Sequence, residues 1–155
     1  MTSKHSRKQR GNAMIELVLI APWFFLLFTG LVNAGITTYG LIAVQNAARV
    51  AAEHTSENST TATDRAGACA LVISQLKGLP AIGSGFTSDC SADPVRVSVN
   101  YCDGTTPCAG SSTSIDGGPA TFVTVTYSLP HLFQLPLANL SSVTRSVEMR
   151  LRDNL

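Results

Sequence analysis

The sequence is poor in charge, and the shortage is concentrated near its N-terminus. Charged residues make up 14% of the 155 residues, and Glu16 is the only one between Arg10 and Arg49. A bilayer-spanning helix needs about 20 mostly apolar residues at 1.5 Å of rise each. Residues 17–36 meet that requirement, so the sequence predicts a membrane-spanning helix there.

Signatures of catalysis, metal binding and nucleic-acid binding are also missing. There is no Gly-x-Ser-x-Gly, Walker loop or His-Glu-x-x-His, and no Cys-x-x-Cys, while His5, His54 and His131 are widely scattered. Without residues 1–11, the number of basic residues falls from eleven to seven, whereas all ten acidic residues remain. We therefore expect no enzyme, no metal or other cofactor, no small-molecule substrate and no nucleic-acid partner.

The four basic residues before the apolar run predict its orientation. They are Lys4, Arg7, Lys8 and Arg10. Since positive charge is retained in the cytoplasm, we expect a cytoplasmic N-terminus and an exported C-terminal part. A plain signal anchor would have the same features. A cleaved signal peptide is a third reading, although the run is long for one and its small-residue cleavage sites are poor.

Glu16 stands at the start of the apolar run, where a carboxylate is costly. A charged side chain costs roughly 2.5–3.5 kcal/mol at the bilayer centre and less near the interface. One reading places Glu16 at the lipid headgroups, where it needs no partner. The other reading gives it a positive partner when helices pack together, since two charges in a low dielectric offset each other's desolvation.

The residues around Glu16 resemble a known processing motif. Gly11, four further residues and then Glu16, just before an apolar helix, resemble the type IV prepilin motif. With Pro22 and the later Asn-Ala-Ala-Arg at residues 46–49, the segment is similar to the TadE-like family, pseudopilins of the tight-adherence (Tad/Flp) pilus system.

The resemblance implies a role for each residue of the motif. A prepilin peptidase would cut between Gly11 and Asn12, and Glu16 would meet the free amine of a neighbouring subunit. Leu17 stands where the Flp major pilin has Tyr, which favours a minor pseudopilin. The implied partners are the inner membrane, the prepilin peptidase and other pilins and pseudopilins of the same system.

Four cysteines follow the apolar run, in the part expected to be exported, where disulfides persist. They allow three pairings. We expect Cys69–Cys90 and Cys102–Cys108, because each pair closes a short loop; free buried thiols are the alternative.

Hydrophobic periodicity predicts a pilin-like α+β fold with three parts. These are a basic leader (1–11), a long helix (12–54) and an exported domain (55–155). In the outer half of the long helix, the apolar positions share one face, namely Ala43, Ala47, Val50, Ala51 and His54.

The exported domain should contain a helix over 64–77 and a three-stranded antiparallel sheet. The strands are expected over 95–101, 123–129 and 143–151, with Tyr101 on the apolar side. Arg145 breaks the pattern of the third strand, either at a sheet edge or because the strand begins after it.

Two functions are compatible with these features. The first is a minor pseudopilin, processed by a prepilin peptidase, that takes part in assembling a Tad/Flp-type pilus for adherence. The second is a single-pass anchored binding module that forms no filament. The first predicts a mature chain beginning at Asn12, and the second predicts a chain beginning near Met1.

Overall fold

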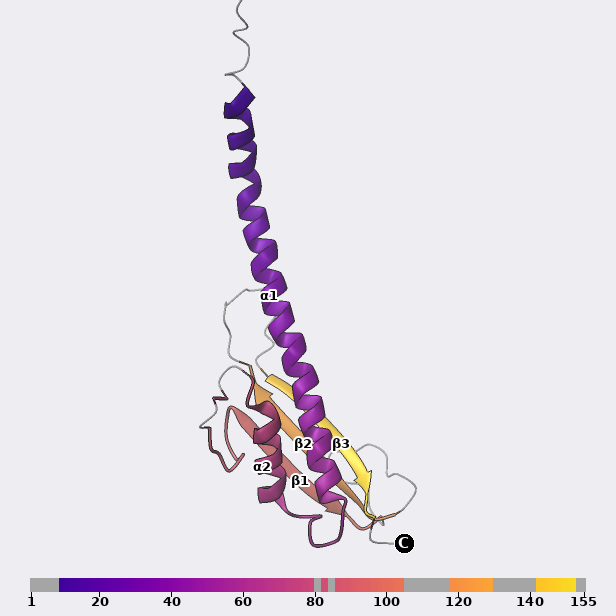
Figure 1. Ribbon diagram of the computed structural model, residues 1–155. Helices are drawn as coiled ribbons and strands as arrows, with labels where there is room; N and C mark the ends of the chain where they lie inside the picture. The colour runs from indigo at the N-terminus through magenta and orange to yellow at the C-terminus, as the bar shows by residue number, and fades with distance from the viewer. Residues whose placement is uncertain (1–8, 80–81, 84–85, 105–117, 130–141, 153–155) are drawn as a thin grey trace, which may run out of the picture. The chain divides into compact units, whose positions relative to one another are not determined.

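The computed structural model describes residues 9–79, 82–83, 86–104, 118–129 and 142–152. Its elements follow the order α1 (Gln9–Thr55), α2 (Arg65–Leu76), β1 (Val95–Cys102), β2 (Ala120–Ser128) and β3 (Ser142–Arg150) (Figure 1). This α+β arrangement of a long N-terminal helix, a second helix and an antiparallel sheet confirms the predicted fold class. The chain forms two compact units, residues 1–36 and 37–155, and α1 contributes to both.

Helix α1 is continuous and begins before Gly11 rather than after it. Pro22 lies inside it, although proline removes one backbone hydrogen bond of the helix. In the second unit, α1 buries a stripe of small side chains, namely Val44, Ala47, Ala48, Ala51 and Ala52. The expected face was partly wrong, because Ala43, Val50 and His54 are only half-buried. Alanine covers about half of the helix circumference here, so hydrophobicity alone does not fix which part of that half faces the core.

Helix α2 begins at a polar cap and packs through the predicted stripe. Asp64 is the N-cap residue, and its Oδ1 accepts a hydrogen bond of 2.9 Å from the Gly67 amide. The expected core positions, Cys69, Val72, Ile73 and Leu76, are all buried.

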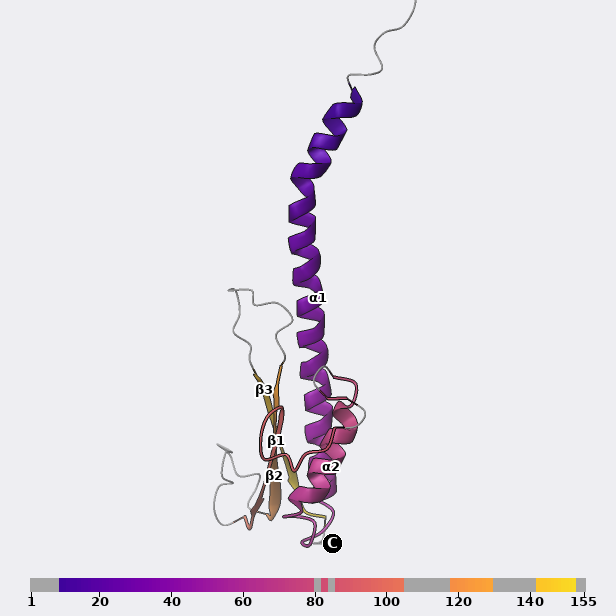
Figure 2. The ribbon, with the colours of Figure 1, turned by 90° about the vertical axis from the view of Figure 1, so that its left-hand side faces the viewer.

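The sheet is a meander in the order β1-β2-β3, antiparallel throughout. Figure 2 shows α2 and the adjoining part of α1 on the same face of the sheet. That inner face carries Val97, Val123, Val125, Tyr127 and Val143, all in one core cluster with residues of both helices. Alternation along the strands therefore places the core of the second unit between one sheet face and two helices.

Two details at the sheet edges differ from simple alternation. Arg145 lies opposite Val125 on the edge strand β3, and it is exposed. Because β3 begins at Ser142, the edge position explains Arg145 and a later strand start does not. Tyr101 is 47% exposed rather than buried. The end of α1 covers its neighbour Thr121 instead, through the Thr55–Thr121 hydrogen bond.

Candidate membrane and assembly segment

Between residues 17 and 28, α1 is apolar on every side and exposed. Trp23, Phe24 and Phe25 are 70%, 68% and 71% exposed, although consecutive residues point about 100° apart around a helix. Within the described residues, Met14–Thr55 is the one helix long and apolar enough to cross a membrane, with a mean hydropathy of 2.2 over an 18-residue stretch. A helix that is apolar all round requires lipid or other helices around it. This single N-terminal helix therefore suggests single-pass membrane anchoring.

Glu16 is the acid of this segment and lies exposed on α1 between Ile15 and Leu17. No ion pair of the described residues includes it. Gly11 and Asn12 lie in the first turns of α1. Gly11 and Glu16 are five residues apart and therefore lie within two turns of one helix.

The second unit, residues 37–155, is cross-linked by disulfides. Cys69 of α2 and Cys90 of the following loop are bonded, with Cα atoms 5.9 Å apart, which is the pairing predicted from the sequence. Cys102 is also disulfide-bonded. Its predicted partner Cys108 lies outside the described residues, so that pairing remains a prediction.

A polar contact joins the end of α1 to the start of α2. His54 Nε2 lies 3.3 Å from Asp64 Oδ2. The backbone hydrogen bond from Gly67, and then the contact with His54, lower the pKa of Asp64 from its ordinary value of 3.8. A Cβ at position 67 would lie 2.7 Å from His54 Nε2 and still closer to Asp64 Oδ2. Glycine at this position is therefore what lets both side chains reach the first turn of α2.

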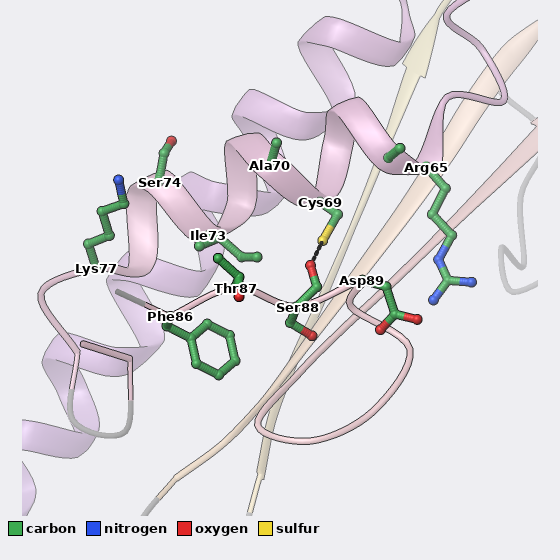
Figure 3. A pocket seen from close by; sticks show the side chains of 11 residues that line it. Arg65, Cys69, Ala70, Ile73, Ser74, Lys77, Phe86, Thr87, Ser88 and Asp89 are labelled. Atoms are coloured by element: carbon green, nitrogen blue, oxygen red, sulfur yellow. Dashed lines mark hydrogen bonds between the residues drawn. The ribbon is translucent and has the colours of Figure 1, made fainter. Parts of the chain in front are cut away.

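A cavity of about 640 Å³ lies between α2 and the loop that ends at Cys90. Figure 3 shows the side chains that line it. Ala66, Ala70, Ile73 and Phe86 supply apolar walls, and Lys77 stands near one end. Cys69 Sγ lies 3.3 Å from the Ser88 carbonyl oxygen, a contact rather than a donated bond because a disulfide sulfur carries no proton. The disulfide thus holds the loop that forms one wall.

The acidic, histidine and cysteine side chains of the described residues do not form a metal site. No group of three or more His, Cys, Asp or Glu side chains there could hold a metal ion. The lowered pKa of Asp89 has a local cause, the hydrogen bonds from the Ser91 hydroxyl and amide. Asp89 and Asp64 therefore act as turn and cap residues.

The N-terminal segment also matches a known family. The model of the family described as TadE-like protein matches residues 11–53. Over this segment, the chain is similar to the TadE-like family. The match begins at Gly11 and covers Glu16, Pro22 and the Asn-Ala-Ala-Arg sequence. No curated protein and no solved structure matches the chain.

Sequence reasoning found the TadE-like segment but not the cavity beside α2. The segment is continuous, so its length, lack of charge and motif can be read directly. The cavity joins α2 to a loop about fifteen residues further on. Its sequence signal is the recurrence of small exposed residues every four positions, at Ala66, Ala70 and Ser74, and this signal is weak.

Proposed function

We propose that this TadE-like protein is a minor pseudopilin, anchored in the inner membrane and trimmed by a prepilin peptidase between Gly11 and Asn12. It would then take part in assembling a Tad/Flp-type pilus for adherence. The observation that carries the proposal is the apolar, exposed segment of α1 with Glu16 near its start. Its N-terminus would face the cytoplasm and its C-terminal domain would be exported.

Assembly would exchange the lipid around α1 for neighbouring helices. The exposed aromatic and aliphatic side chains provide the packing surface. After trimming, Glu16 would pair with the free amine of a neighbouring subunit, which offsets the desolvation of both charges. The pilus itself would be the scaffold for adherence, with this chain as a minor subunit.

Processing is tested with Gly11→Leu, because a bulky residue at the cut site should block the peptidase. We expect the variant to accumulate as the full-length precursor in the membrane, while N-terminal sequencing of the wild type begins at Asn12. Gly83→Leu is the matched control, since nothing lies within 4 Å of a Cβ at this glycine. A Gly11→Leu chain still shortened by the mass of the leader would refute the processing step.

Assembly is tested with Glu16→Ala. We expect this variant to be trimmed normally but to support few pili, counted by electron microscopy. Glu53→Ala is the control on the same helix, because Glu53 makes only an exposed pair with Arg49 at 3.4 Å. Normal piliation by Glu16→Ala would remove the carboxylate from the assembly step.

The cavity of about 640 Å³ favours a second candidate function, an anchored binding module outside any filament. The N-terminal sequence separates the two. A mature chain that begins near Met1 would support the binding module, and one that begins at Asn12 would support the pseudopilin.

A further inference from the structure

The outer face of the sheet, turned away from the helices, carries two rows of polar side chains, most of which have hydroxyl groups. The strand register places Arg96, Thr126 and Thr144 in one row and Ser98, Thr124 and Ser146 in the next. The hydroxyls of Thr124 and Ser146 are 2.9 Å apart, and those of Thr126 and Thr144 are 3.1 Å apart. We call these six residues the hydroxyl face. Apart from the aliphatic parts of their side chains, they offer only hydrogen-bonding groups.

A second cavity, of about 450 Å³, opens beside this face. Its polar lining comes from Arg65, Ser91, Arg96, Ser98, Thr124 and Thr126. A volume of this size is within the roughly 300–1,000 Å³ of small-molecule sites. It is separate from the TadE-like segment and from the cavity of Figure 3 in all its lining residues except Arg65.

The wall opposite the hydroxyl face is fixed by several bonds. The Cys69–Cys90 disulfide holds the loop to α2, and the Val97 amide donates to the Cys90 carbonyl at 3.0 Å. An Nη2 of Arg65, at the start of α2, donates to the same carbonyl at 3.0 Å. Arg65 is thereby held at the rim of the cavity.

The described lining of the cavity contains no carboxylate, and the nearby acids use only some of its donors. A guanidinium has five N–H groups, and Arg96 uses Nε for Asp93 at 3.2 Å. Both of its Nη atoms, and the Ser98 hydroxyl, have no partner among the described residues. Asp93 Oδ1 also accepts from the Ser128 hydroxyl, while Asp89 accepts from Ser91. The nearby carboxylates are therefore engaged, and the open capacity is that of N–H and O–H donors.

We propose that this cavity binds an oligosaccharide that carries carboxylate groups. The Nη atoms of Arg96 would take a sugar carboxylate in a paired, charge-assisted contact, with Arg65 at the opposite rim. The sugar hydroxyls would exchange hydrogen bonds with Ser98, Thr124 and Thr126. Neighbouring rows stand about 6.8 Å apart along a strand and neighbouring strands about 4.8 Å apart, a spacing that several hydroxyls of one ligand can follow. A simple anion would leave this array unused.

The test is calorimetry on the full chain in detergent, with trigalacturonate, the neutral trisaccharide of galactose and inorganic phosphate as probes. We expect trigalacturonate to bind. The neutral trisaccharide should bind at least about tenfold more weakly, because it lacks the charge-assisted pair. Arg96→Gln should weaken trigalacturonate binding by a similar factor. Arg49→Gln, the same change in another exposed ion pair, should leave it unaltered.

Ser98→Val separates a sugar site from an anion site. We expect it to weaken trigalacturonate binding about threefold or more, while any phosphate binding stays the same. Absence of trigalacturonate binding would overturn the proposal. Equal binding of the neutral trisaccharide and trigalacturonate would also overturn it. So would phosphate binding as tight as that of trigalacturonate, if Ser98→Val had no effect on trigalacturonate binding. The proposal does not depend on trimming or on pilus assembly, because no lining residue belongs to α1.

Discussion

At the residue scale, a buried hydroxyl pair ties the end of α1 to the sheet. Thr55 and Thr121 are both 0% exposed, and their Oγ1 atoms are 3.1 Å apart. Thr55 Oγ1 also lies 3.1 Å from the Ala52 carbonyl oxygen. Neither hydroxyl is exposed to water, so Thr121 depends on Thr55 for a hydrogen bond, whereas Thr55 also has the Ala52 carbonyl.

Removing one hydroxyl of this pair should therefore be worse than removing both. We expect Thr55→Val to lower the free energy of unfolding by about 1–3 kcal/mol, because it leaves Thr121 buried without a partner. Adding Thr121→Val should restore much of that loss, because two apolar side chains of similar shape then meet. Urea unfolding of the single and double variants measures both effects, and strictly additive losses would contradict this role.

Asp64 caps helix α2, and its carboxylate makes the stability of the domain depend on pH. Asp64→Ala should lower the Tm by about 3 °C or more at neutral pH, because the cap of α2 is lost. Asp64→Asn should lower it less, since asparagine also caps helices. Thermal melts followed by circular dichroism compare the three proteins.

The sign of the pH effect follows from the lowered pKa of Asp64. The carboxylate stabilises the fold at pH values above its unfolded pKa, near 3.8, and this stabilisation disappears as the pH falls through the lower folded pKa. The Tm difference between wild type and Asp64→Asn should therefore shrink as the pH falls below about 3.8. A difference that grows in acid would contradict the assignment.

At the scale of elements, the Cys69–Cys90 disulfide links α2 to the loop that contains residues 88–91. It links residues 21 apart in sequence, and both sulfur-bearing residues are buried, at 3% and 0% exposure. Cys90 has a φ of 55°, in the left-handed region where non-glycine residues are uncommon. The cross-link thus helps fix a loop conformation that the backbone alone does not favour.

Replacing both Cys69 and Cys90 by Ala should lower the free energy of unfolding by about 3 kcal/mol, the usual effect of a bond across such a loop. Guanidinium unfolding without reductant measures it. Reductant should destabilise the wild type more than the double variant, whose remaining response reports the disulfide of Cys102. A double variant as stable as the oxidised wild type would contradict this prediction.

At the scale of the whole molecule, the two units have different solvents. The core residues all lie in residues 37–155, and the large exposed apolar side chains are concentrated in residues 14–32. The first unit therefore gains its stability from lipid or neighbouring helices, and the second from its own core.

A chain that begins at Thr37 should remain folded without detergent and melt within about 3 °C of the full chain, because every core residue is retained. A chain that begins at Arg49 lacks Val44, Ala47 and Ala48 and should be markedly less stable. Circular dichroism and gel filtration compare the two. Failure of the longer chain to fold would show that residues 1–36 contribute to the stability of the domain.

The sequence by itself determined the features that one continuous segment can encode. The lack of charge over 17–48 gives the apolar helix, and the Gly11–Glu16 spacing gives the motif. Alternation gives the three strands, and Asp64 gives the start of α2. Each depends on neighbours in the chain, so periodicity and composition suffice to find it.

Only the tertiary structure decided which surfaces meet. It turned Val44 and Ala48 of α1 towards the sheet instead of Val50, exposed Tyr101, and brought Arg65 and Arg96 to one cavity. The physical reason is that packing depends on the combined shape of elements distant in sequence. Where alanine lies on several sides of a helix, hydrophobic burial distinguishes those sides too weakly to choose the buried face before the sheet is in place.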